Sequence, residues 1–116
     1  MSNWNLLFAM MLVFIGQLLV FLQINGQFLW KWVEKNPLLM SVSLGAPIAY
    51  LFILSQQHFY KYFEGQLWPS RFIGFSIGIL VFSLCAYFLK GEGMNAKTLV
   101  CISLSAVIIG IQILWK

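Results

Sequence analysis

The sequence predicts an all-α integral membrane protein, a four-helix transmembrane bundle with short loops and both termini on one side of the bilayer. Of its 116 residues, 61% are hydrophobic and only 9% are charged, a balance that would expose large apolar patches in water. The charged residues leave four uncharged windows, at residues 1–30, 36–60, 72–89 and 98–115. About 20 apolar residues, each rising about 1.5 Å, cross a hydrocarbon core of about 30 Å, so each window can hold one helix.

The tryptophans support the same four spans. An indole ring favours the headgroup level, where its body is buried and its N–H reaches water. All five lie at window edges, at Trp4, Trp30, Trp32, Trp68 and Trp115. We therefore expect one domain, residues 1–116, with spans at about 4–30, 38–60, 68–89 and 96–115.

The first span is expected to be a mature helix, because it lacks the basic start and the small-residue cleavage pattern of a signal peptide. At 100° per residue, one of its faces carries small residues and amides, and Gln17 lies about a quarter turn away from this face. The members of that face are Ala9, Gly16, Gln23 and Gln27.

These amides have two interpretations. An unpaired amide in hydrocarbon costs several kcal/mol, so each must find a partner, water or a ligand. In the first interpretation they bridge neighbouring helices, each bond contributing about 0.6 to 2 kcal/mol. In the second they line a polar cavity that holds a solute.

The second span begins at Pro37, a residue that suits the first turn of a helix. Pro47 lies deep in the span and removes the hydrogen bond that the Ser43 carbonyl would have accepted, which predicts a kink there. Tyr50 and Gln57 are seven residues apart and share a face, so they are further candidates for the cavity.

The third and fourth spans each carry a row of small residues. Gly74 and Gly78 form a GxxxG pattern in the third span, and Ser103, Ala106 and Gly110 follow at helical spacing in the fourth. One row can pack within the subunit while the other packs against a second copy. The two rows together predict helix packing and a dimer.

The connections leave the orientation open. Residues 90–95 form a tight turn that makes the last two spans antiparallel neighbours. An even number of spans puts both termini on one side, which leaves three basic residues on one face against four on the other. The two sets are Lys61, Arg71 and Lys116, and Lys31, Lys35, Lys90 and Lys97. This bias is too weak to specify one orientation, and insertion in both orientations is the alternative.

Several classes of function are not expected. There is no Asp, and all three Glu residues lie in connections, so no carboxylate is expected inside the bilayer for proton exchange or acid–base chemistry. No catalytic triad, phosphate loop or metal-ligand pattern is visible, and Cys85 and Cys101 are expected to pack as small apolar residues. We expect no enzyme activity, no cofactor, no metal and no nucleic-acid partner.

Residues 74–115, GFSIGILVFSLCAYFLKGEGMNAKTLVCISLSAVIIGIQILW, resemble the last two spans of the drug/metabolite transporter superfamily, in particular its four-helix members. These are the small multidrug resistance proteins and the subunits that flip aminoarabinose-linked lipid. The similarity rests on Gly74 and Gly78, the tight turn at Gly91, and Gly110 near the end of the last helix.

The resemblance implies a homodimeric or heterodimeric transporter, often of dual topology. Its first three helices would bind the substrate and its fourth would dimerise. Small multidrug resistance proteins carry a glutamate within their first helix, whereas this chain has Gln17 and its neighbouring amides there. Proton-coupled export of cations is therefore not expected.

The sequence thus predicts a transporter or flippase subunit that acts as a dimer on a neutral or lipid-linked small solute, in the cytoplasmic membrane of a bacterium. A dimer could pair two copies or pair the chain with a paralogous subunit. The alternative is a non-transporting structural or accessory subunit of a larger membrane complex. The candidate cavity residues are Gln17, Gln23, Gln27, Tyr50 and Gln57.

Overall fold

The structure, a computed structural model, describes residues 2–115. Within that range all elements are helical: α1 (Ser2–Asn25), η1 (Gly26–Phe28), α2 (Lys31–Glu34), α3 (Pro37–Tyr62), α4 (Trp68–Cys85), η2 (Ala86–Lys90) and α5 (Ala96–Leu114). Four segments are long and apolar enough to cross a membrane: Asn3–Phe28, Pro37–Tyr62, Trp68–Lys90 and Ala96–Leu114. The all-α class and the four long apolar helices are therefore confirmed, while the crossing of a membrane stays a prediction.

Local signals in the sequence explain where the helices begin. Pro37 and Pro69 lie in the first turns of α3 and α4, where a missing N–H leaves no hydrogen bond unmade. Asn95 precedes α5, and its Oδ1 accepts a hydrogen bond of 2.9 Å from the backbone N–H of Thr98. Such a cap satisfies one of the free donors at a helix N-terminus.

The turns on either side of α4 use left-handed backbone conformations. Glu64 and Gly65, with φ of 56° and 87°, reverse the chain between α3 and α4. Gly91, with φ of 80°, ends the wide π-helical turn η2 before the link to α5. Glycine adopts this region without steric cost, so Gly65 and Gly91 fit their positions.

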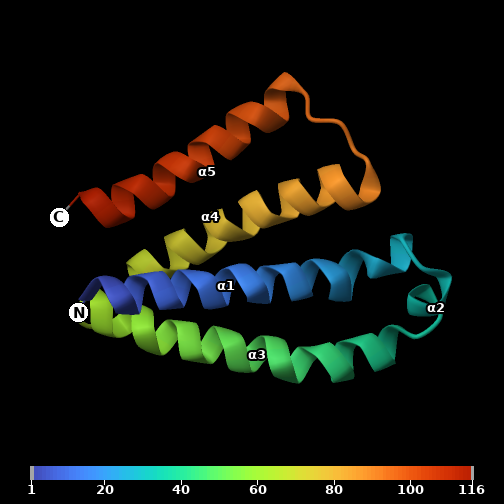
Figure 1. The fold of residues 1–116 in the computed structure, drawn as a ribbon, viewed down its shortest axis with the longest axis horizontal. Helices are drawn as coiled ribbons and strands as arrows, with labels where there is room; N and C mark the ends of the chain where they lie inside the picture. The colour runs from blue at the N-terminus through green and yellow to red at the C-terminus, as the bar shows by residue number, and fades with distance from the viewer. Residues whose placement is uncertain (1, 116) are drawn as a thin grey trace.

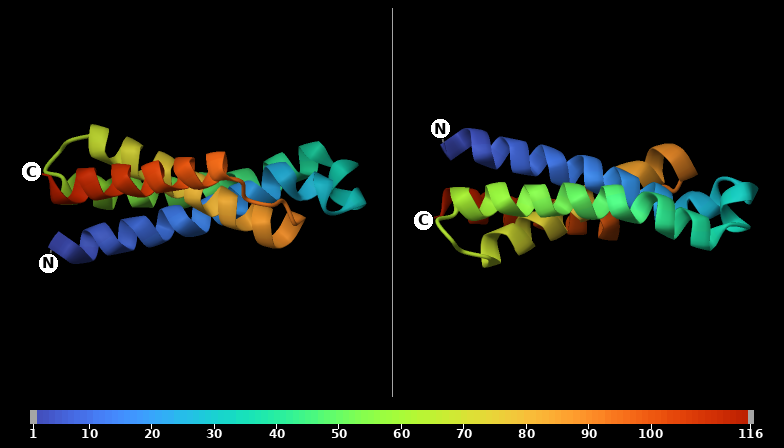
Figure 2. Two further views of the ribbon diagram at one scale, coloured as in Figure 1. Left: turned by 90° about the horizontal axis from the view of Figure 1, so that it is seen from above. Right: turned by 90° about the horizontal axis from the view of Figure 1, so that it is seen from below.

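The four long helices form an open array in which α1 is central (Figure 1). α1 packs against both α3 and α4, α3 and α4 share few contacts, and α5 packs only against α4. The molecule measures 46 × 36 × 19 Å, so its shortest dimension is about two helix diameters, as the side views indicate (Figure 2). The predicted bundle is therefore not closed by α5, although α4 and α5 are the expected antiparallel neighbours.

The beginning of α1 and the end of α5 lie at the same end of the array, at the left of Figure 1. α1 and α4 run in one direction along it, and α3 and α5 run in the other. This arrangement agrees with an even number of crossings. On which side of a membrane these ends lie stays a prediction.

The core lies along α1. It contains Ala9, Val13 and Phe21 of α1 and continues into α3 and α4 through large buried residues. These include Phe59, Ile73, Ile77 and Val81. The rings of Phe21 and Phe82 meet edge to face with centroids 5.3 Å apart, an arrangement that favours aromatic pairs.

Two further contacts join α1 to α3. Gly16 faces the ring of Phe52, because a Cβ built on Gly16 would lie 2.5 Å from Phe52 Cε1. Near the start of α1, Asn5 Oδ1 lies 2.9 Å from His58 Nδ1, and the Phe8 ring packs edge to face on the same imidazole. The lone histidine is thus a link between two helices at one end of the array.

Most of the apolar surface of the chain is not covered by the chain itself. Only 11% of the most apolar window of α3 is buried, and only 6% of that of α5. Leu38, Trp68 and Leu114 are each more than 70% exposed, at 76%, 74% and 82%. Such a surface would aggregate in water and suits contact with lipid or another membrane helix.

α3 continues through Pro47 as one α-helix. Pro47 and Ser43 are both exposed, so the carbonyl left without its partner lies on a turn away from the core. The proline therefore does not divide the span, and a kink at this position stays a prediction.

Candidate functional site

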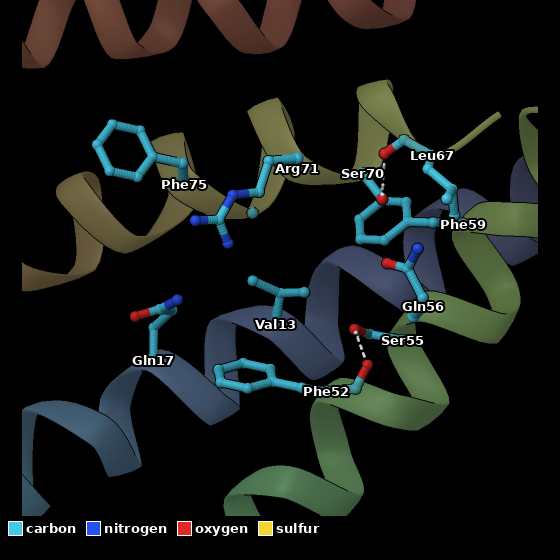
Figure 3. A pocket seen from close by; sticks show the side chains of 11 residues that line it. Val13, Gln17, Phe52, Ser55, Gln56, Phe59, Leu67, Ser70, Arg71 and Phe75 are labelled. Carbon is cyan, nitrogen blue, oxygen red and sulfur yellow. Dashed lines mark hydrogen bonds between the residues drawn. The ribbon is translucent and has the colours of Figure 1, made fainter.

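A groove of about 470 Å³ lies between α3 and α4, with α1 as its floor (Figure 3). This volume is within the usual range for small-molecule sites. The groove exists because both helices pack on α1 and share few contacts with each other. Its lining combines polar side chains with apolar ones from all three helices, and the apolar residues are Val13, Phe52, Phe59, Leu67 and Phe75.

Gln17 is the one predicted cavity residue that lines this groove. Its amide lies against Gly78, because a Cβ on that glycine would be 3.1 Å from Gln17 Cδ and Nε2. Gln17 is half-buried, and among residues 2–115 no hydrogen-bond partner is found for its side chain. A partly buried amide that no other described residue satisfies is available to a ligand or to water.

Two further polar side chains of the groove were not selected from the sequence. Gln56 of α3 and Arg71 of α4 both line it, and in Figure 3 the guanidinium of Arg71 projects into the space above Gln17. Gln56 lies next to Gln57 in the chain, a shift of 100° around the helix. Arg71 had a visible signal, since Arg71, Gly74 and Gly78 follow at helical spacing on one face of α4.

The two serine hydroxyls of the groove both donate hydrogen bonds to backbone carbonyls. Ser55 Oγ donates to the Phe52 carbonyl at 2.9 Å, and Ser70 Oγ donates to the Leu67 carbonyl at 2.8 Å, as Figure 3 shows. Each hydroxyl therefore offers only acceptor lone pairs to a ligand. The available donors are the N–H groups of Gln17, Gln56 and Arg71.

The other two amides of α1 have different roles. Gln23 Nε2 donates to the carbonyls of Met40 and Ser41 in α3, each at 3.3 Å, so Gln23 bridges two helices. Gln27 Nε2 donates to the Ile24 carbonyl at 2.9 Å within its own segment. Both residues line a separate hollow of about 290 Å³ beside the first turn of α3. Gln23 therefore fits the interpretation in which an amide bridges two helices, and Gln17 fits the one in which an amide lines a cavity.

The structure does not bring Tyr50 and Gln57 to the groove. Tyr50 is 63% exposed and Gln57 is also exposed, on the outer surface of α3. Neither belongs to the groove lining. A role for them in binding a solute stays a prediction.

The small-residue rows lie in two different settings. Gly78 packs against Gln17, while Gly74 lines the groove with no atom within 4 Å of a built Cβ. On α5, Ser103 and Ala106 are exposed, and the built Cβ of Gly110 also meets nothing within 4 Å. The row on α5 is therefore free to meet another helix, and the dimer stays a prediction.

The groove continues along α1 and α4 through two smaller hollows. The first hollow, of about 340 Å³, shares Gln17 and Phe75 with the groove. It also shares Phe82 with the next hollow, the third in this row, which has a volume of about 140 Å³. Asn25, Lys90 and Glu92 line that third hollow, beyond the other end of α4. Polar and aromatic side chains thus follow one face from the beginning of α4 to its end.

The charges of the lining limit the chemistry. Among residues 2–115, Arg71 is the only ionised side chain that lines the main groove, and none of these residues contributes a carboxylate to it. Within residues 2–115 no group of three or more His, Cys, Asp or Glu side chains could hold a metal ion. The arrangement is suited to binding a polar group beside aromatic surface.

No family model, no curated protein and no solved structure matches the chain. The similarity of residues 74–115 to the drug/metabolite transporter superfamily remains a resemblance in glycine placement.

Proposed function

We propose that the chain is a subunit of a small membrane transporter or flippase, of the drug/metabolite transporter type, that acts as a dimer on an amphiphilic, lipid-linked solute. Gln17 carries the proposal. Its half-buried amide has no partner among the described residues, and it lies where the main groove continues into the hollow along α4. An amide in this position can replace part of the hydration of a polar head group during passage.

The form of the groove favours a lipid-linked solute over a free one. Its mouth lies between α3 and α4, on the lateral surface of the helix array, and Arg71 and Phe75 there are exposed. A lateral mouth lets a head group enter while the hydrocarbon chains stay in the bilayer. Since the groove contains no carboxylate, exchange of the solute against protons bound there is not part of the proposal.

The test is a lipid-flipping assay with the full chain in liposomes. A fluorescent lipid in the outer leaflet is quenched by dithionite, and the fraction protected by transfer to the inner leaflet is followed over time. We expect the wild-type chain to accelerate transfer over empty liposomes. Gln17→Leu should slow it about tenfold, because the head group then loses a hydrogen bond in a medium of low dielectric constant.

The matched control is Gln27→Leu. It removes an amide of the same segment that bonds only to Ile24 and does not line the groove. Its transfer rate should equal that of the wild type. Equal rates for wild-type liposomes and empty liposomes would contradict the proposal.

The alternative function is an accessory subunit of a larger membrane complex. The observation in its favour is α5, which contacts only α4 and leaves a long apolar surface open. Co-purification of a stoichiometric membrane partner, with no lipid transfer by the chain alone, would favour this alternative.

A further inference from the structure

We propose that the groove between α3 and α4 binds an anionic head group, a phosphate or a carboxylate, through Arg71 together with the amides of Gln17 and Gln56. The inference rests on the proposed function, since it gives the charge of the solute at the same groove. An anionic head group differs from the neutral solute that the amides alone suggest.

The sign of the charge follows from the lining. An amide offers both donors and acceptors and does not select a charge. The guanidinium of Arg71 is ionised and offers donors only, in a planar fork that matches a phosphate or a carboxylate. With no carboxylate in the lining to neutralise it, Arg71 favours an anion and disfavours a cation.

The free donors of the groove come from three helices and lie along its length. Ser55 and Ser70 donate to backbone carbonyls, which leaves the amides of Gln17 and Gln56 and the guanidinium. In Figure 3 these three groups come from α1, α3 and α4 and line the same groove, with Arg71 between Gln17 and Gln56. An anionic head group that moves along the groove would therefore meet donors from three helices.

The depth of the groove fits an amphiphile with such a head. Arg71 lies in the first turn of α4, which begins at Trp68, a residue expected at the headgroup level. Gly78, against which Gln17 packs, lies seven residues further along α4, about 10 Å deeper at 1.5 Å per residue. The phosphate of a lipid could therefore contact Arg71 first and Gln17 after moving inward past Phe75.

The experiment measures binding to the full chain in neutral detergent micelles by isothermal titration calorimetry. The probes are dihexanoyl phosphatidylglycerol, which is anionic, dihexanoyl phosphatidylcholine, which is zwitterionic, and inorganic phosphate. We expect phosphatidylglycerol to bind more tightly than phosphatidylcholine. Arg71→Gln should weaken phosphatidylglycerol binding about tenfold or more, because a hydrogen bond to a charged group is lost.

Two further variants separate a site from general surface charge. Arg71→Lys keeps the charge without the fork and should give an intermediate loss. Lys61→Gln is the matched control, because Lys61 is an exposed cation in the last turn of α3 that does not line the groove. It should leave binding unchanged, and circular dichroism should show equal helix content in every variant.

The outcomes separate the sources of the anion. Arg71-dependent binding of phosphatidylglycerol alone assigns the site to a lipid head group, whereas the same dependence with inorganic phosphate assigns it to a free anion. Equal binding of phosphatidylglycerol and phosphatidylcholine, an unchanged affinity in Arg71→Gln, or an equal loss in Lys61→Gln would overturn the inference.

A failure of the anion site can also be distinguished from a failure of the proposed transport function. Arg71-dependent binding without lipid transfer in liposomes would remove the transport proposal and leave the anion site. Transfer of an anionic lipid at the same rate in wild type and Arg71→Gln would remove the anion site and leave the transport proposal.

Discussion

Gly16 lies at a close contact between α1 and α3. A Cβ at this position would lie 2.5 Å from Phe52 Cε1 and 3.1 Å from Phe52 Cζ, so any side chain must displace the ring. Glycine costs about 1 kcal/mol of helix propensity relative to alanine, and here that cost is offset by the close contact between two spans.

Gly16→Ala should therefore destabilise the fold in spite of the better helix propensity of alanine. The ring of Phe52 packs against the core, and overpacking such a close contact costs about 1 to 3 kcal/mol, which exceeds the gain of at most about 1 kcal/mol. The free energy of unfolding is measured by circular dichroism in mixed micelles with increasing dodecyl sulfate. Gly74→Ala is the control, because its built Cβ meets nothing within 4 Å, and it should be neutral or stabilising. A Gly16→Ala variant as stable as Gly74→Ala would contradict this prediction.

At the scale of single residues, the sequence predicted which side chains need partners and left open which partners they find. Gln17 and Gln23 are chemically identical, yet one lines a groove and the other bonds to Met40 and Ser41. The choice depends on the rotation of α1 against its neighbours. The same limit explains Gln56, which lies only 100° from the predicted Gln57.

At the scale of elements, the α1–α3 pair shows how an amide can join two spans. Gln23 Nε2 lies 3.3 Å from each of two carbonyls in the first turns of α3. The built Cβ of Gly45 on the next turn would lie 3.7 Å from the same nitrogen, so a small residue there leaves room for the amide. The side chain therefore connects the end of α1 to the beginning of α3.

Gln23→Leu should lower the free energy of unfolding by about 0.6 kcal/mol, the average value for a hydrogen bond between membrane helices. The two bonds are long, so a loss above about 2 kcal/mol is not expected. The same dodecyl sulfate titration measures it. Gln27→Leu, which breaks a bond only within its own segment, should leave the free energy of unfolding unchanged from that of the wild type. Equal losses in both variants would show that the bridge to α3 is not the cause.

The helices themselves were predictable because charge and proline mark their ends. Uncharged windows, Pro37, Pro69 and the Asn95 cap are all local signals, and each coincides with a helix boundary. Which helices pack against each other was not predictable in the same way. A helix that is apolar on every side gives no stripe to show which face meets a neighbour, and lipid is as apolar as a leucine side chain.

For the whole molecule, the question of a monomer or a dimer depends on α5. It contacts only α4, so the array has one long helix covered on a single side. Its inner face carries the buried Ser105 and the partly buried Ile109 and Ile113. The row of Ser103, Ala106 and Gly110 lies beside this face and is not covered by another part of the described chain.

This row predicts the dimer contact, and substitution of Ala106 tests it. A phenylalanine at this position would hold two helix backbones apart, and overpacking of about 1 to 3 kcal/mol corresponds to a dissociation constant raised by about fivefold to 150-fold. Leu104→Phe is the control, because Leu104 is 58% exposed and lies about 200° around the helix from Ala106. Energy transfer between labelled chains in micelles measures the equilibrium. A bulky ring within a close helix contact cannot be accommodated without separating the backbones. An Ala106→Phe chain that associates as tightly as the Leu104→Phe chain would therefore place the dimer contact elsewhere. Absence of association in both chains would leave the protein a monomer.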